Sequence, residues 1–260
     1  DALALAPGHS ARDTFHMLLE AGAAMEPKAF AVGVRIEHPQ SAVSQAQFGP
    51  AWTRLPAAGY KLACHLPNGR SAFTFCVCPG GQVVAAASEP GGLVTNGMSL
   101  RARDGTNCNG GLLVGVSPAD FGSPHPLAGV EFQRRWEETA FTLGGGDFRA
   151  PVQTVGDLLS GRPSAALGSV LPTYRPGVRP GDLTRCLPGY VTDTLRAALP
   201  LLGRKLRGFD APEAVLTGVE TRSSSPVRLL RGADLQSPTI RGLYPCGEGA
   251  GYAGGITSAA

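Results

Sequence analysis

The residues with the clearest chemical potential form a glycine-rich stretch close to the end of the chain. Five of the nine residues from Gly247 to Gly255 are glycine, and they follow a short apolar run. A strand, a glycine turn and a helix start in that order expose backbone N–H groups and a positive helix end, which suit a phosphate or another electron-rich ligand. A plain surface turn needs one or two glycines. The stretch therefore predicts a loop that contacts a nucleotide cofactor.

Part of this stretch also matches a dinucleotide-binding pattern by its letters. Residues Gly249 to Gly254 read G-x-G-x-x-G after an apolar run. A dinucleotide fingerprint further requires a βαβ unit and an acidic residue about 20 positions later, and the sequence ends before that position. The match alone therefore does not predict the first loop of a Rossmann fold.

Two thiols, Cys76 and Cys78, are the second group with reactive potential. A thiol beside a redox cofactor can take part in disulfide exchange, but residues two apart on a strand lie near the upper limit of disulfide Cα separation. A packed strand end before the turn at Pro79 is the alternative that we favour. No cysteine pair has the C-x-x-C spacing of a zinc or redox site, so we expect free thiols, a reducing compartment and no metal.

Two polar segments have side chains that suit an anionic ligand. Residues 221–228 combine three serines with two arginines, Arg222 and Arg228, which suits a phosphate, a carboxylate or a polarised carbonyl. The alternative, a polar hairpin turn in water, is slightly preferred. His9 and Arg12 lie where an expected strand passes through a glycine into a helix. His9 is equally well interpreted as a turn histidine bonded to nearby backbone.

Alternating α and β elements are expected to position these residues at the two ends of the chain. Residues 2–7 predict a buried strand, and Ser10 predicts the cap of a helix over residues 11–20 that Gly22 closes. Near the other end, residues 214–221, 226–230 and 239–244 predict strands. The glycine-rich stretch would then begin a helix near Ile256.

The middle of the chain predicts a different layer, an antiparallel or mixed sheet of meander type. Turn signals such as those near Gly69 and Gly91 separate most of its closely spaced strands. The expected strands are residues 29–37, 60–66, 71–77, 82–87, 92–96 and 111–116, with a short helix and loop before Pro50.

Helical periodicity follows this sheet region. Residues 126–141 predict one helix, and the leucine spacing over residues 195–206 predicts a second with a buried stripe. Pro200 inside that stripe predicts a kink or two short helices. Residues 144–180 predict a long irregular connection with at most one short helix at residues 155–159.

Composition limits the function classes. The 260 residues are 17% charged and 43% hydrophobic, which suits a folded, soluble chain of one or two domains. The net charge of +3 is dispersed, so we expect no nucleic-acid partner. The same charge supports small anionic ligands only weakly. Apolar runs are too short for a membrane span or a secretion signal.

Both ends look truncated, which suggests an internal piece of a longer protein.

Several segments together resemble the family of uncharacterised FAD-dependent dehydrogenases. They occur in order from near the first residue to near the last, and jointly they are highly specific. The segments are residues 5–15 (LAPGHSARDTF), 30–40 (FAVGVRIEHPQ), 75–81 (FCVCPGG), 96–99 (NGMS), 220–228 (ETRSSSPVR) and 243–256 (LYPCGEGAGYAGGI).

This resemblance implies FAD as cofactor and an α/β fold: part of a Rossmann-like FAD-binding domain, with an inserted substrate-side domain of a mixed or antiparallel β-sheet plus helices. Residues 1–28 would be the last strand and helix before the insertion, residues 29–213 the inserted domain, and residues 214–260 the return to the FAD-binding domain. The ADP-binding fingerprint of such proteins lies near their N-terminus and is absent here. We therefore expect this chain alone to bind FAD weakly or not at all.

The resemblance also implies roles for single residues. Gly247 and Glu248 would meet the ribityl or pyrophosphate part of FAD, and the start of the helix would face the pyrimidine edge of the flavin. The residues implied in cofactor binding are Gly8, His9, Gly247, Glu248, Gly249, Gly251, Tyr252, Gly254, Gly255 and Ile256. Catalytic residues are not identified, and the candidates are Cys76, Cys78, His9 and Arg222.

The expected function is that of the C-terminal portion of an FAD-dependent oxidoreductase, in which the flavin N5 exchanges a hydride with an unknown small molecule. The alternative is a non-catalytic flavin- or nucleotide-binding scaffold module. The cytoplasm and the plastid stroma are both consistent with free thiols. The sequence does not predict an oligomeric state.

Overall fold

The computed structural model describes residues 1–259 and divides the chain into two compact units. Unit 1 consists of Asp1–Ala31, Val116–Arg135 and Arg222–Ala260, and unit 2 consists of Val32–Gly115 and Trp136–Thr221. Each unit is therefore assembled from segments that are distant in sequence. Whether these units correspond to the domain limits expected from the sequence stays a prediction.

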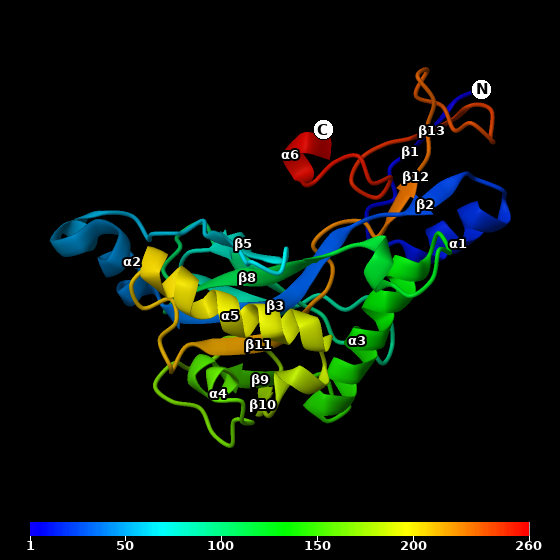
Figure 1. Ribbon diagram of the computed structural model, residues 1–260. Helices are drawn as coiled ribbons and strands as arrows, with labels where there is room; N and C mark the ends of the chain where they lie inside the picture. The colour runs from blue at the N-terminus through cyan, green and yellow to red at the C-terminus, as the bar shows by residue number, and fades with distance from the viewer. Residues whose placement is uncertain (260) are drawn as a thin grey trace. The chain divides into compact units, whose positions relative to one another are not determined.

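Unit 1 combines short strands with the helix near the N-terminus (Figure 1). Two of its strands, β1 and β13, are parallel, and two others, β2 and β12, are antiparallel. Its elements are β1 (Leu3–Leu5), α1 (Arg12–Glu20), β2 (Met25–Pro27), the 3-10 helix η2 (Pro118–Asp120), the first half of α3 (Ala128–Gly144), β12 (Val227–Leu229), β13 (Leu243–Pro245) and α6 (Ile256–Ala259).

The first strand and helix differ from the sequence expectation in two details. β1 is not buried, since Leu3 is 59% exposed, so that expectation is wrong. A two-stranded ribbon covers only part of its own side chains, which explains the exposure. Ser10 does not cap α1, because Ala11 holds the N-cap position without a side-chain hydrogen bond. Gly22 does close the helix, with a φ of 83°.

A small apolar core holds unit 1 together. Phe15 and Leu18 lie on the buried face of α1 and are 0% and 5% exposed. They pack in one cluster with Val130 of α3 and with residues of β12 and β13. Since the cluster draws on all three segments of unit 1, its burial fixes where the loops after β1 and β13 lie.

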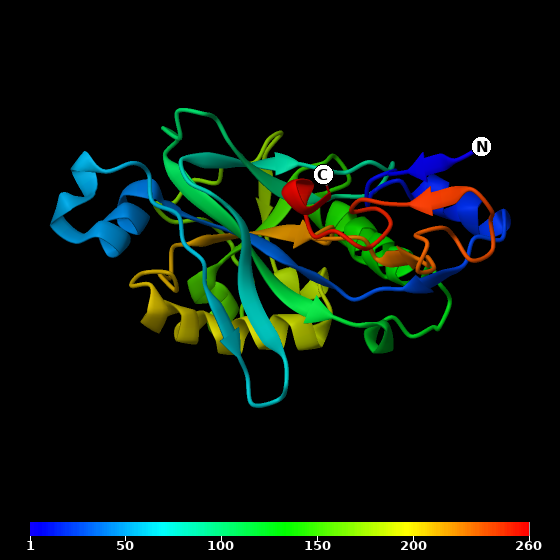
Figure 2. The same cartoon turned by 90° about the horizontal axis from the view of Figure 1, so that it is seen from above.

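Unit 2 is built on a seven-stranded mixed sheet in the order β10-β9-β11-β3-β8-β5-β4. Figure 2 shows the long β3 (blue) and β8 (green) beside each other in this sheet. β10 and β9 are parallel, whereas β11 is antiparallel to both β9 and β3, and β5 is antiparallel to β4 and β8. This confirms the expected α/β class with a mixed sheet and helices. The simple meander order is wrong, because β3 lies between β11 and β8.

Apart from β9 and β10, the remaining strands of unit 2 lie at or near predicted strands, with shifted ends. β6 and β7 form a separate antiparallel pair. The strands are β3 (Phe30–Pro39), β4 (Ala63–His65), β5 (Ser71–Cys78), β6 (Gly81–Ala85), β7 (Thr95–Ser99), β8 (Asn107–Val116), β9 (Ala150–Thr154), β10 (Val178–Pro180) and β11 (Val215–Glu220). The helices are α2 (Gln40–Phe48), α4 (Val155–Leu159), α5 (Gly189–Lys205), and the 3-10 helices η1 (Gly49–Arg54) and η3 (Leu183–Arg185).

The long helix α5 lies along the sheet and contacts β4 and β5 (Figure 1). Its leucine stripe is buried as predicted, with Leu195, Leu199 and Leu202 at most 1% exposed. Pro200 lies within one continuous helix, so the alternative of two short helices is wrong. The packing of the buried stripe on the sheet compensates for the hydrogen bond that proline removes.

The connection between α3 and α5 is more regular than expected. The short helix α4 forms at the predicted residues, but β9 and β10 are additional strands that the sequence analysis missed. Both strands pair within the sheet rather than forming a hairpin with a turn signal. A buried strand of five residues among glycines, prolines and arginines has little sequence signature of its own.

Candidate functional site

The candidate site lies in unit 1, where β1 and β13 end beside each other. Their register pairs Leu3 with Leu243 and Leu5 with Pro245, and the pairing continues as the Cys246 amide donates to the Leu5 carbonyl at 2.9 Å. The chain then turns into Gly8 and His9 after β1, and into Gly247 and Glu248 after β13. Loops beyond the carboxyl ends of adjacent parallel strands are where open α/β sheets bind ligands.

Glycine is required where these two loops meet. Gly8 and Gly247 have φ values of 77° and 73°, in the left-handed region that favours glycine. A Cβ added at Gly249 would collide with the carbonyl oxygen of Gly8. The two loops therefore touch through their backbones. We call Gly8, His9 and Gly247–Gly249 the glycine corner.

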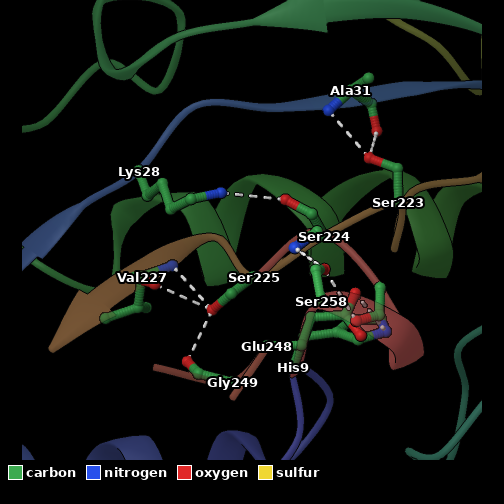
Figure 3. A network of polar contacts seen from close by, with 12 residues as sticks. His9, Lys28, Ala31, Ser223, Ser224, Ser225, Val227, Glu248, Gly249 and Ser258 are labelled. Atoms are coloured by element: carbon green, nitrogen blue, oxygen red, sulfur yellow. Dashed lines mark hydrogen bonds and ion pairs between the residues drawn. The ribbon is translucent and has the colours of Figure 1, made fainter. Parts of the chain in front are cut away.

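His9 and Glu248 face each other across the glycine corner, as Figure 3 shows. Their side chains are about a quarter exposed, and His9 Nε2 lies 3.9 Å from Glu248 Oε1, too far for a hydrogen bond. Burial lowers the pKa of His9; Glu248 opposes this shift, while Arg222 and Arg12 add to it. His9 Nδ1 is buried without a hydrogen-bond partner among the described residues. Neutral His9 thus has an unused polar atom beside the loops.

The serine segment between β11 and β12 supports the corner from inside the fold. Ser223 Oγ bonds both backbone groups of Ala31, at 2.9 and 2.7 Å. Ser225 Oγ lies between β12 and the glycine corner, 3.0 Å from the Gly249 carbonyl that accepts its hydrogen bond (Figure 3). Both serines are buried, so the preferred alternative of a hairpin turn in water is wrong. Their hydroxyls instead satisfy backbone groups that water cannot reach.

Lys28 is a cation of this site that the sequence analysis missed. Its Nζ donates to Ser224 Oγ at 3.1 Å, as Figure 3 shows, and to the Ala29 carbonyl at 3.3 Å. Burial lowers the pKa of Lys28, the neighbouring Arg228 lowers it further, and Glu248 opposes the shift. A lone lysine after a three-residue strand has no motif around it, so only the folded chain reveals its position.

Tyr252 stacks with two arginines. Its ring is covered by the Arg231 guanidinium at 3.8 Å, with Arg228 at 5.7 Å from the ring centre, and the residue is 40% exposed. A guanidinium on an aromatic face is a stabilising arrangement. Tyr252 therefore anchors the end of the glycine-rich loop beside two cations.

The other residues predicted to bind the cofactor lie later in the glycine-rich stretch and have different surroundings. Gly251 has a φ of 84°, and a Cβ there would lie 2.6 Å from the Val227 carbonyl oxygen, so this glycine packs against β12. Gly254 and Gly255 are bridged by Ser258, whose Oγ accepts from the Gly254 amide at 3.2 Å and donates to the Gly255 carbonyl at 3.0 Å. Ile256 begins α6, but its side chain lies outside the described part of the chain.

The two candidate thiols belong to unit 2, so the structure describes them separately from the glycine corner. Cys78 is buried at the end of β5 as the packed interpretation expects, but Cys76 is exposed. Both are free thiols, as are the four other cysteines. Within residues 1–259, no three His, Cys, Asp or Glu side chains form a group that could hold a metal ion.

The arrangement in unit 1 fits an electron-rich ligand. It combines close glycine backbone from two strand ends with a carboxylate acceptor, the unpartnered His9 Nδ1 and nearby cations. Glu248 can accept from a ligand hydroxyl, whereas Lys28 and the arginines favour negative charge.

None of the helices in the described residues has the length and apolarity to cross a membrane.

Comparison with known proteins gives two findings. The family described as "FAD-dependent protein, C-terminal domain-like" matches residues 29–223. An uncharacterized protein of Clostridium beijerinckii is 51% identical over 263 residues, an alignment that covers all of this chain and 49% of the relative. The chain thus spans about half the length of the curated relative it matches.

Proposed function

The chain belongs to the FAD-dependent protein, C-terminal domain-like family, and from this premise we propose that it is part of an FAD-dependent oxidoreductase in which the glycine corner of unit 1 contributes to the cofactor site. The observation that carries the proposal is the parallel pairing of β1 with β13, which brings Gly8 and Glu248 to one place from opposite ends of the chain. A fold that uses bare glycine backbone at two adjacent strand ends is suited to a dinucleotide cofactor.

Each residue of the glycine corner and its surroundings would make a different contact with the cofactor. Glu248 would accept a hydrogen bond from a ribityl hydroxyl, and the glycines would let the cofactor approach the backbone. Gly254, Gly255 and Ile256 would lie along the flavin, and Tyr252 beside it. Lys28 and Arg222 would favour a phosphate or a negatively charged ring edge. FAD, when bound, would supply the capacity to transfer a hydride through flavin N5.

His9 has a distinct role in this proposal. Its lowered pKa keeps the imidazole neutral near pH 7, so it can place a donor or an acceptor at Nδ1 without adding charge. Because His9 Nε2 lies 3.9 Å from Glu248 Oε1, one ligand hydroxyl placed beside these two atoms could bond to both side chains. We therefore assign His9 to cofactor orientation rather than to proton transfer.

The test uses the whole protein that carries this chain and compares Glu248→Ala with the control Glu20→Ala, at an exposed end of α1. Loss of a charged hydrogen-bond acceptor costs about 1.5–3 kcal/mol, so Glu248→Ala should weaken FAD binding about tenfold or more, measured by flavin fluorescence titration. Glu20→Ala should bind as the unchanged protein does.

Flavin reduction separates the two functional classes. Bleaching of bound FAD by reduced nicotinamide or by another small-molecule donor supports an oxidoreductase. A protein that holds FAD but is never reduced by such donors supports the non-catalytic scaffold. A colourless whole protein that added FAD cannot restore contradicts the cofactor assignment altogether.

A further inference from the structure

A second chemically distinctive place lies in unit 2, where β5 carries Cys76 and Cys78. The pairing of β5 with β8 is irregular here: Phe75 opposes Gly111, and Cys78 opposes Asn109. The chain therefore advances by three residues along β5 for two residues along β8, which defines a β-bulge. The extra residue shortens the span between the two cysteines relative to an extended strand.

The bulge gives the two thiols different surroundings while the Cys78 thiol contacts the backbone of Cys76. Cys76 has a φ of 42°, unusual for a residue other than glycine, and its side chain is exposed. Cys78 is 7% exposed, and its Sγ lies 3.4 Å from the Cys76 carbonyl oxygen. An exposed thiol thus stands next to a buried one on the same strand.

A buried arginine fixes the backbone of the bulge. Arg35 of β3 is fully buried and donates from Nη1 to the Cys76 carbonyl at 2.7 Å. Its Nη2 donates to Asn96 at 2.8 Å and to Glu220 at 2.9 Å, and its Nε forms an ion pair with Glu220. A Cβ at Gly97 would collide with the guanidinium. Partners on several strands therefore leave this cation little freedom.

These neighbours bias which thiol ionises. The Cys78 thiol, as hydrogen-bond donor, lowers the pKa of Cys76 to about 5, and Arg35 adds to the effect against the opposing effect of burial. The same contact, together with burial, raises the pKa of Cys78 strongly.

The other titratable groups that face the pair are more deeply buried. Burial raises the pKa of Glu220 to about 7, against the effect of Arg35, and raises that of Cys108 to about 12. Tyr60 has its pKa raised by burial as well. Cys76 is therefore the thiolate of this cluster at neutral pH.

We propose that Cys76 and Cys78 form a thiol–disulfide exchange site for small or flexible disulfide substrates, with Cys76 as the attacking and Cys78 as the resolving sulfur. An accessible sulfur with a buried partner in contact is the arrangement that such exchange requires. This activity is separate from the proposed cofactor site, and its argument rests only on residues of unit 2.

The exchange balances without a further oxidant. The Cys76 thiolate attacks one sulfur of a disulfide R–S–S–R, forming a Cys76–S–S–R bond while R–S⁻ leaves. The Cys78 sulfur then attacks Cys76 Sγ, its proton passes to the second leaving R–S⁻, and a Cys76–Cys78 disulfide forms. The protein dithiol is oxidised by two electrons, and the substrate is reduced to two thiols.

Local geometry suits a disulfide that is easily reduced again. Cysteines two apart on an extended strand lie near the upper limit of disulfide separation, and the bulge relieves part of that distance. A small strained ring has a more oxidising potential than an ordinary structural disulfide. The pair is therefore expected to cycle rather than to remain oxidised.

The test treats the reduced full chain with the aromatic disulfide 5,5′-dithiobis(2-nitrobenzoate) and follows the released thiolate. Trypsin should then give a peptide of residues 71–101, which contains Cys76 and Cys78 but no other cysteine. In the unchanged protein we expect a fast phase that persists at pH 6, and a peptide lighter by two hydrogens that carries no aromatic label.

Three variants assign the roles. Cys76→Ser should abolish the fast phase, and Cys78→Ser should stop at a labelled Cys76 and shift the fast phase to higher pH, because the thiol donor is gone. Cys246→Ala, which removes a partly exposed thiol of unit 1, should leave the fast phase unchanged. A labelled peptide 71–101 in the unchanged protein would overturn the proposal even if a serine variant failed to fold. A fast phase that survives in folded Cys76→Ser would also overturn it.

Discussion

At the residue scale, His38 makes the stability of unit 2 depend on pH. The ring is 3% exposed, and its Nε2 lies 2.8 Å from the Phe209 carbonyl, to which the neutral ring can donate. Burial lowers the pKa of His38 from 6.5 to about 4, although Phe209 and Asp210 oppose the shift. The unfolded chain therefore binds a proton between these two pH values that the folded chain does not bind. Stability should fall as pH decreases through this window, by about 3 kcal/mol in total.

His38→Gln tests this prediction, because glutamine keeps an N–H donor for the Phe209 carbonyl and does not titrate. Urea denaturation at several pH values between 7 and 4 should show a shallower loss of stability in the variant than in the unchanged protein. The difference between the two slopes isolates His38 from the other titrating groups. Equal slopes would show that His38 is protonated in the folded state or is paired differently.

Single residues also show how far the candidate site could be predicted from the sequence. Glycine spacing and the family resemblance predict Gly8, His9, Gly247 and Glu248 as site residues, and the structure brings them together. Lys28 is not predicted, since one lysine between a short strand and a long one carries no pattern. Ser223 and Ser225 were misjudged because serine in a polar run favours water by composition, whereas burial depends on contacts with Ala31 and Gly249 that are distant in sequence.

At the element scale, the contact between the loops after β1 and β13 predicts a sharp difference between two glycines. A Cβ at Gly249 would collide with the Gly8 carbonyl, whereas a Cβ at Gly254 meets nothing within 4 Å. Overpacking in a tight contact costs about 1–3 kcal/mol. Gly249→Ala should therefore lower the free energy of unfolding by about this amount, measured by urea denaturation with circular dichroism.

Gly254→Ala is the matched control for this measurement and should change the free energy of unfolding by no more than about 0.5 kcal/mol. Both substitutions add the same methyl group to the same loop, so their difference reports the backbone contact alone. If the two variants lost equal stability, Gly249 would not lie against Gly8 as the structure shows.

Elements with strong local periodicity were predictable, and those that depend on pairing were not. The leucine stripe of α5 is predictable because it repeats with the helical period, and the short helix α4 lies at its predicted residues. β9 and β10 were missed because Pro151 and Pro180 weaken their strand signature. The two strands form because β9 pairs with β10 and with β11, and this pairing cannot be predicted from the local sequence.

At the scale of the whole molecule, the family match and the fold agree on the class of protein but rest on different parts of the chain. The matched residues 29–223 include all of unit 2, whereas the glycine corner lies outside them. Sequence patterning predicted the mixed sheet with helices, since alternating apolar residues and turn signals are local. It did not predict that residues 116–135 belong to the same compact unit as both chain ends, because only tertiary contacts determine such grouping.

The last prediction concerns how FAD affinity is divided along the protein. The relative from Clostridium beijerinckii aligns with this chain over 49% of its own length, so about half of that protein has no counterpart in these 260 residues. The glycine corner offers acceptors and close backbone for one portion of a long cofactor, and affinity accumulates over all of its contacts. In fluorescence titrations, residues 1–260 should bind FAD at least about 100-fold more weakly than the whole relative, which corresponds to about 2.8 kcal/mol. Equal affinities would mean that the corner and its neighbours form a complete cofactor site, whereas failure of both proteins to bind would contradict the cofactor proposal itself.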